Sequence, residues 1–468
     1  MGSLFSSLQT ASTALNVFSR ALGTDQTNIS NASTAGYAAQ QVNVRAIDLS
    51  GDGAGAADFI SLSSNSNAIA DSGVQAASSQ AAASGTSAQQ LTAINSLFDI
   101  TGSSGILAAL QQFSSAFSTL SVTPNDATLQ ANALSAAGTV ASAFRSVAAG
   151  LDNQQAEIDS NIATTTSQIN GLAQSIQQLN VKVLGESSVD PATDASLRSD
   201  LDQLSSLVDI GVAKNANGTV SVLAGGQLPL VEGDQAFTLS ANPNAAPGSQ
   251  ILSSAGGDSP ATFSGQLGAL LETRNNTLGG LLGVNGSPGT LNSLAAGFAT
   301  QVNTILTSGV TSNGTTGVPI FSFDNTNPAN AARSLTLNAA IAPGQLAVAT
   351  TGTGAESNGV ANQLAALAAS TAPANQIDGF SPEGLFGSIA ASVGQRLSDA
   401  RTAATNDQTT LTTAQTNRQQ ESGVSLDREA TNITTYQRAY QANAQVVQIL
   451  SQLTSDTINI IGGSGAAL

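Results

Sequence analysis

The stretch that decides the fold is residues 4–29, LFSSLQTASTALNVFSRALGTDQTNI, near the start of the chain. Apolar side chains recur in it at alternating spacings of four and three, the heptad pattern of a helix that pairs with another helix. The stripe consists of Leu4, Leu8, Ala11, Leu15, Phe18, Leu22 and Ile29, with Asp25 in the slot between the last two. This pattern predicts a terminal α-helix that needs a partner, because an isolated helix of this length is marginal in water.

A second apolar stripe near the other end of the chain follows the same rule. It consists of Ile433, Tyr436, Tyr440, Val447 and Leu450, with Asn443 in the intervening slot. We expect the two stripes to pair with each other and, in an assembly, with neighbouring copies. The alternative is that each helix packs on its own domain, which the narrow stripes disfavour because Asp25 and Asn443 interrupt them.

The middle of the chain has a different organisation. All twelve prolines lie between Pro124 and Pro382, so the two ends can be helical while the middle is interrupted. A periodic apolar run follows Pro124 and stops at Gly185, which predicts a rod of two or more long helices. A shorter apolar stripe from Leu197 to Val208 closes this helical block.

The period changes after Asp209. Ile210 and Val212 alternate with polar or small residues, a turn follows at 215–218, and Val220 and Val222 resume the alternation, which predicts a β-hairpin. Beyond the hairpin we expect strands over 228–239, a loop near 241–260, helix over 265–308, strands over 315–350, and helix from about 381 to the end.

Together these patterns predict a multidomain α+β protein. Its expected parts are a paired N- and C-terminal α-helical coiled-coil domain, an elongated helical-bundle domain and an inserted small β-rich outer domain. The expected boundaries are 1–75 and 425–468 for the terminal assembly domain, 76–208, 264–308 and 375–424 for the helical rod, and 209–263 and 309–374 for the outer domain.

Composition narrows the possible partners. The chain has 30 acidic and 13 basic residues, a formal net charge of −17. Nucleic acid is disfavoured because binding to phosphate backbones needs clustered cations, and anionic membrane surfaces are disfavoured for the same reason. No apolar stretch approaches the roughly 20 residues that span a bilayer. The first 20 residues have no continuous apolar segment and no basic side chain before Arg20, so we expect export, if any, without a cleaved signal.

Composition also excludes much chemistry. Cysteine and histidine are both absent, which rules out thiol nucleophiles, the common catalytic triads and zinc sites built on these residues. Hydrolysis by a carboxylate pair stays formally open, although the acidic residues are dispersed. Gly51–Gly55 lacks the Lys-Ser/Thr of a phosphate-binding loop, and the spacing of Asp48, Asp52 and Asp58 does not fit an EF-hand. We expect no catalytic residue, metal or cofactor.

A helix stop follows the first stripe, in the segment NISNASTAGY at 28–37. Asparagine and serine compete for backbone hydrogen bonds, and a glycine can supply a left-handed turn. The segment resembles the signature that follows the N-terminal helix in axial proteins of the bacterial flagellum. Near the other end, GVSLDREATNI at 423–433 and YQRAYQANA at 436–444 resemble the second signature of that family. The motif positions are Asn28, Asn31, Thr34, Gly36, Tyr37, Ala439 and Ala442.

The middle of the chain resembles the hook-associated branch of this family. The segments that carry this resemblance are LRSDLDQLSSLVD at 197–209, NGTVSV at 217–222, GGQLPLV at 225–231 and GQLGALL at 265–271. The resemblance implies a structural subunit that forms a ring at the hook–filament junction, outside the cell. Its implied partners are other copies, the hook protein, a second junction protein and an export chaperone, with type III export.

Two alternatives stay open at this point. A hook protein shares the terminal signatures, but it should be mostly β between its ends, whereas residues 125–208 are predicted to be helical. The other alternative is a secreted adhesin or hydrolase carried on an axial scaffold.

Overall fold

A computed structural model describes residues 2–48, 55–98, 100, 104–185, 190–242, 245, 250–256, 262–284, 286–352 and 357–463. The chain divides into two compact units. The first comprises 1–79, 169–238 and 408–468, and the second comprises 80–168 and 239–407. Three long helices contribute residues to both units: α2 (Ala68–Asn95), α4 (Ala127–Gly185) and α11 (Pro382–Ser422). The finer division into three domains stays a prediction.

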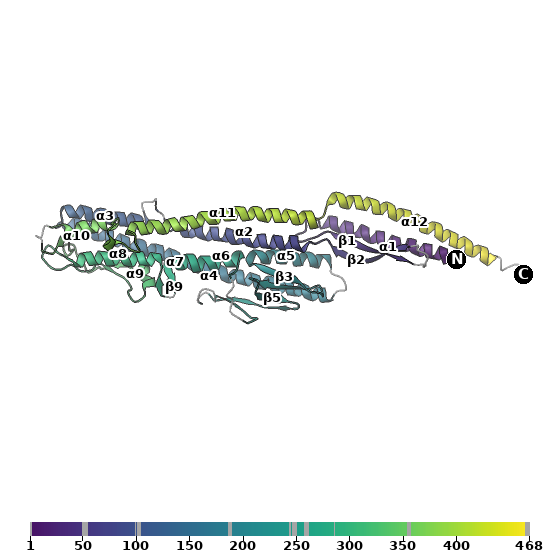
Figure 1. Cartoon of the computed structure of the whole chain (residues 1–468), viewed down its shortest axis with the longest axis horizontal. Coiled ribbons are helices and arrows are strands. Elements are labelled where there is room, and N and C mark those ends of the chain that lie inside the picture. Colours follow the sequence, from purple (N-terminus) through teal and green to yellow (C-terminus); the bar gives the residue numbers. More distant parts are fainter. Residues whose placement is uncertain are drawn as a thin grey trace. The chain divides into compact units, whose positions relative to one another are not determined.

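The two ends of the chain form paired helices in the first unit. α1 (Gly2–Ser30) and α12 (Leu426–Gly463) lie side by side (Figure 1). The Phe18 and Tyr436 rings meet between them, with centroids 6.2 Å apart. The predicted pairing of the terminal helices is therefore confirmed.

A β-hairpin that the sequence analysis did not predict packs against α1. It consists of β1 (Gln40–Asp48) and β2 (Gly55–Ser64), which pair antiparallel with Val42 opposite Leu62 and Val44 opposite Phe59. The alternation of Val42 and Val44 with polar residues was the available signal. Most of the expected glycine-rich loop, residues 51–54 with Asp52, lies outside the described residues.

The rest of the first unit contains α5 and a small sheet. α5 (Pro191–Leu207) begins where the Asp190 side chain accepts a hydrogen bond from the Thr193 N–H, a standard N-cap. The sheet is antiparallel in the order β3-β4-β5-β6, with bounds Ile210–Lys214, Val220–Ala224, Leu228–Glu232 and Gln235–Ala236. The predicted hairpin is thus present. Asn180 of α4 holds the sheet, because its amide donates to the Val220 and Gly233 carbonyl oxygens.

The length of α4 differs from what the sequence predicted. The sequence predicted a rod of two or more helices after Pro124, and the structure has a single helix of 59 residues. The reason is that no proline lies between Pro124 and Pro191, and glycine alone weakens a helix by only about 1 kcal/mol. The helix ends at Gly185, as expected. No helix among the described residues is long and apolar enough to cross a membrane.

The second unit has an aromatic core. Phe113 and Phe117 of α3 (Gly105–Val122) are fully buried with Phe298 of α8 (Thr290–Thr307). The Phe113 ring lies 4.6 Å from that of Phe117 and 5.3 Å from that of Phe298, measured between centroids. α10 (Gly359–Leu367) packs on α3 beside this core.

The helix predicted over 265–308 is interrupted. It comprises α6 (Gly265–Glu272), a π-helical turn (Thr273–Leu278), α7 (Gly279–Leu282) and α8, with a hairpin of β9 (Gly283–Val284) and β10 (Ser287–Pro288) before α8. The break falls at Gly283, whose φ of +100° is not helical. A methyl group there would lie 2.1 Å from the Ser287 carbonyl oxygen, so only glycine fits.

The remaining strands of the second unit are short. β8 (Ile251–Ser253) pairs with β7 (Leu239–Ala241) inside the segment expected to be a loop, which corrects that expectation. The strands predicted over 315–350 are reduced to two-residue pairs, with 3-10 and α-helical turns (Pro328–Asn330, Ala331–Ser334) between them. These pairs join β11 (Gly309–Val310) to β14 (Ala349–Thr350) and β12 (Phe321–Ser322) to β13 (Thr336–Leu337).

A buried asparagine, Asn292, binds the backbone of the two helical turns at 328–334. The Asn292 amide donates to the Leu282 and Ala329 carbonyl oxygens, and its Oδ1 accepts from the Ala332 N–H. These bonds satisfy backbone groups that a strand would otherwise pair. After the turn at Pro373–Asn375, α11 begins at Pro382, close to the expected position.

Candidate assembly site

The two apolar stripes occupy the facing helices of the first unit. On α1, Ala11 is buried and Leu4, Leu8, Leu15, Phe18 and Leu22 are half-buried, whereas Ile29 is 36% exposed. On α12, Ile433, Tyr436, Asn443, Val447 and Leu450 are half-buried, whereas Tyr440 is 38% exposed. The Asn443 amide donates to the Ala439 carbonyl oxygen of its own helix. That these residues serve assembly stays a prediction.

Asp25, the residue that interrupts the first apolar stripe, has a specific neighbour on α12. Asp25 and Glu429 of α12 line the same hollow, and their side chains are only 6% and 4% exposed. Burial, followed by the hydrogen bond and the charge of Glu429, raises the pKa of Asp25 to about 7. Asp25 is therefore a buried contact between the two ends and not merely a gap in the stripe.

Asn28 ties three segments together at the end of α1. Its amide nitrogen donates to the Gln40 carbonyl oxygen at 3.0 Å and to the Glu429 Oε2 at 3.2 Å. Its Oδ1 accepts from the Gln40 N–H and from the Tyr37 hydroxyl, both at 2.9 Å. Burial raises the pKa of Tyr37, which keeps the hydroxyl a donor. This motif residue thus joins α1, β1 and α12.

The other motif positions shape the turn that follows α1. The Asn31 amide donates to the Thr27 carbonyl oxygen, and the Thr34 hydroxyl donates to Asn31 Oδ1. Gly36 has a φ of +73°, as the helix-stop interpretation expects, and a methyl group on it would lie 2.3 Å from the Ala195 carbonyl oxygen. On α12, Ala439 is half-buried and Ala442 is exposed.

An ion-pair network that the sequence analysis missed lies next to the turn that follows α1. Arg198 of α5 donates to the Gly36 carbonyl oxygen at 3.0 Å and pairs with Asp194 and Asp71. Arg418 of α11 lies 2.8 Å from Asp202 and 3.7 Å from Asp71. Burial raises the pKa of Asp71, although both arginines act to lower it. Spacing along one chain gives no signal for such a network.

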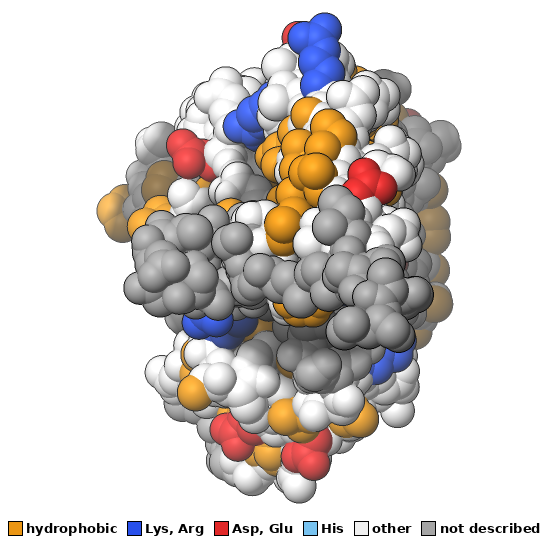
Figure 2. All heavy atoms as spheres, turned by 90° about the vertical axis from the view of Figure 1, so that its right-hand side faces the viewer, with side chains coloured by type: hydrophobic (Ala, Val, Ile, Leu, Met, Phe, Trp, Pro, Cys, Tyr) orange, Lys and Arg blue, Asp and Glu red, His pale blue; other side chains and the backbone are white. Residues whose placement is uncertain are grey.

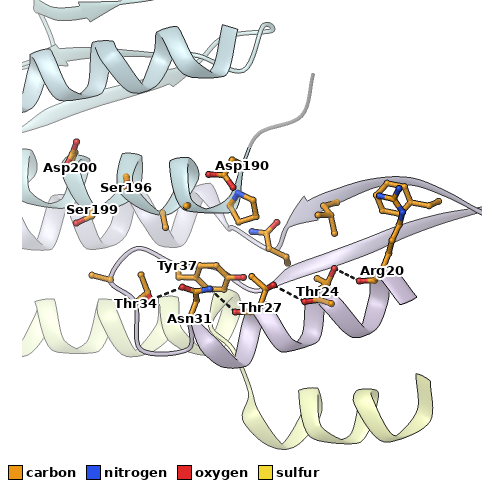
Figure 3. A pocket seen from close by; sticks show the side chains of 18 residues that line it. Arg20, Thr24, Thr27, Asn31, Thr34, Tyr37, Asp190, Ser196, Ser199 and Asp200 are labelled. Carbon is orange, nitrogen blue, oxygen red and sulfur yellow. Dashed lines mark hydrogen bonds between the residues drawn. The ribbon is translucent and has the colours of Figure 1, made fainter. Parts of the chain in front are cut away.

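A hollow of about 770 Å³ lies between α1, the β1–β2 hairpin and α5. Figure 3 shows the side chains that line it, among them Thr24, Thr27 and Asn31 of α1 and Ser196 and Ser199 of α5. At one edge the Arg20 guanidinium lies 4.3 Å from the centre of the Phe59 ring, a cation–π contact.

The charged groups of this hollow have structural partners. Asp190 caps α5, and Asp200 accepts a hydrogen bond from Ser175 at 2.6 Å. Among the described residues that line this hollow, both carboxyl groups are engaged in these structural contacts, whereas a carboxylate-pair hydrolase would need one as general acid and one as general base. Among the described residues, no group of three or more carboxylates could hold a metal ion.

α12 carries a second apolar face that is about half exposed to solvent. Val446, Ile449 and Leu453 recur at helical spacing and are 45%, 60% and 48% exposed. They lie beside the positions that face α1, and Ile458 and Phe5 are exposed as well. Figure 2 shows one face of the molecule, on which hydrophobic side chains gather in a band between charged ones. Exposed apolar side chains that gather on one surface are typical of sites that contact another polypeptide.

Known families match both the middle and the end of the chain. Residues 91–321 match the family described as the flagellar hook-associated protein FlgK helical domain. Residues 415–460 match the family described as the flagellar basal body rod FlgEFG protein C-terminal.

Full-length relatives agree with these matches. The flagellar hook-associated protein 1 of Bacillus subtilis strain 168 is 27% identical over 99% of this chain and all of its own length. The protein of the same name from Salmonella typhimurium is 24% identical, over 96% of this chain and 99% of its own. A solved structure, the flagellar hook junction protein FlgK from Burkholderia pseudomallei, has the same fold, with a TM-score of 0.63 at 16% identity, covering 74% of this chain and 99% of that one.

The fold, the paired ends and these matches define the class: a structural axial protein of the bacterial flagellum, and not an enzyme. Within that class, the chain belongs to the flagellar hook-associated protein 1 family, the structural proteins of the hook–filament junction. The hook-protein alternative and the adhesin or hydrolase alternative are set aside by this membership.

Proposed function

We propose that copies of this chain form a ring at the hook–filament junction, with the hook protein on one side and a second junction protein on the other. The observation that carries the proposal is the pair of apolar faces on α12. One face packs on α1, and the other, with Val446, Ile449 and Leu453, is exposed in the single chain. A helix that is apolar on two sides is suited to a layer in which each copy covers its neighbour.

The location and route of the protein follow from its family. A hook-associated protein belongs to the flagellum, and we infer an extracellular position at the junction. Export by the flagellar type III apparatus, assisted by an export chaperone and without a cleaved signal, fits this position. The net charge of −17 supports the absence of nucleic acid and anionic membrane surfaces among the partners.

Deletion of the gene tests the proposed function. Cells that lack the protein should make hooks without attached filaments and release unpolymerised flagellin into the medium, and the intact gene should restore swimming. Electron microscopy of the cells and immunoblots of the medium measure both effects. Filaments of normal length on the deletion strain would show that the protein is not the junction subunit.

A further inference from the structure

Two buried carboxyl groups from opposite ends of the chain meet where α1 packs on α12. Asp25 and Glu429 are only 6% and 4% exposed and line the same hollow, and the Asp25 Oδ2 has no hydrogen-bond partner among the described residues. Two ionised carboxylates cannot bond to each other, since each can only accept. A single proton held between the two groups allows one carboxyl to donate a hydrogen bond to the other.

The surroundings of the pair offer little compensation for a second negative charge. Asn28 donates to Glu429 Oε2, and Tyr37 and Tyr436 are neutral neighbours whose pKa values are raised by burial and then by the nearby carboxylates. Among the described residues, Arg428 is the one cation that lines this hollow of about 250 Å³, together with Thr24, Gln40 and Asn432. Among the described residues, no ion pair joins Arg428 to either carboxyl group. Loss of the shared proton thus leaves two buried negative charges in contact.

We propose that Asp25 and Glu429 form a proton-linked clamp, which holds α1 on α12 while the proton is shared and loosens this pairing when the proton leaves. The proposal adds a regulatory feature to the proposed assembly site. It rests on the pairing of the two helices, and it can be tested on the isolated chain without reference to the flagellum.

The direction of the pH effect follows from the change in pKa on docking. Asp25 has a pKa of 3.8 when α1 is free in water and about 7 when it is docked, so the docked form binds more protons between these values. The stabilisation is fully present below pH 3.8 and is lost as the pH rises through about 7. For one proton, the docking constant should fall roughly tenfold between about pH 6 and about pH 8.

The absence of cysteine makes the test direct, because introduced cysteines are the only labelling sites. Ser19→Cys on α1 and Gln437→Cys on α12 replace exposed residues close to the Phe18–Tyr436 contact. Spin labels at these sites broaden each other's spectra only while the helices are docked. The urea concentration that abolishes the broadening, measured in the full chain from about pH 5 to pH 8, gives the docking equilibrium at each pH.

Variants separate the clamp from general acid sensitivity. Asp25→Asn stays neutral and can donate to Glu429 at every pH, so its docking should not change between about pH 6 and pH 8. Glu429→Gln should behave in the same way. Asp427→Asn, a matched change at an exposed position of α12, should keep the tenfold loss of the unaltered chain.

Three outcomes would overturn the proposal. The first is docking of the unaltered chain that does not change between about pH 6 and pH 8. The second is a pH dependence that persists in both Asp25→Asn and Glu429→Gln. The third is docking that is lost at every pH in both neutral variants, because a permanent hydrogen bond should hold the helices together.

Discussion

Asn28 at the end of α1 donates a hydrogen bond to Glu429 at the start of α12, with 3.2 Å between the amide nitrogen and the carboxylate oxygen. The same asparagine bonds twice to the backbone of Gln40, where β1 begins. A residue that belongs to a family signature thus acts as the joint between the two ends of the chain. Asn28 supplies hydrogen bonds to polar groups of Gln40 and Glu429 that are buried, so removing its side chain tests this role.

Asn28→Ala should destabilise the docking of α1 by about 2–3 kcal/mol, because it leaves the Gln40 backbone and Glu429 without their buried partner. Asn31→Ala is the matched control: its amide bonds only to the Thr27 carbonyl oxygen and to the Thr34 hydroxyl, both at exposed positions, so the loss should stay below about 1 kcal/mol. Urea titration of the spin-labelled chain measures both variants. Equal losses would mean that Asn28 is an ordinary helix-end residue.

Leu15→Asp should prevent incorporation while leaving the second unit folded. Leu15 is half-buried in the stripe that faces α12, so losing its contacts costs about 1–2 kcal/mol, and the charge adds a desolvation penalty in the assembled state. Gln9→Asp changes an exposed position of the same helix and should be tolerated. Both variants should melt alike in the second unit, and only Leu15→Asp should fail to restore swimming. Normal swimming by Leu15→Asp would contradict the paired-end arrangement.

Ile449→Asp tests the exposed face of α12. The side chain is 60% exposed, so the substitution should change the stability of the isolated chain by less than about 0.5 kcal/mol. In the assembly the same charge would be buried, and filament attachment should be lost. Gln448→Asp adds the same charge at the neighbouring exposed position and should support filaments. If the Ile449 variant attaches filaments as well as the Gln448 variant does, this face is not an interface.

Gly36→Ala should destabilise the first unit by about 2 kcal/mol or more. The residue has a φ of +73°, and the new methyl group would meet the backbone of Ala195 at 2.3 Å. Gly23→Ala is the control, because that glycine is helical with open space around it, and alanine should stabilise α1 by about 0.5–1 kcal/mol. Urea midpoints of the two variants should therefore move in opposite directions.

Several features could be predicted from sequence because they depend on neighbouring residues along the chain. Apolar spacing revealed that the helices at both ends need partners, and the change of period after Asp209 revealed the β3–β4 hairpin. The helix stop before Gly36 followed from residue types that terminate helices. The β1–β2 hairpin was missed, because a short alternating stretch between two helical patterns is a weak signal.

What the sequence by itself determined was which face of each terminal helix is apolar, where the helices end, and which chemistry is absent. Only the tertiary structure decided which residues stand opposite each other. A heptad pattern repeats, so it fixes the face of a helix but not its register against a partner, and Asp25 reads along the chain as a gap in the stripe. Burial against Glu429 turns that gap into a shared-proton contact, because desolvation and hydrogen bonding depend on groups that meet only when the two ends of the chain come together.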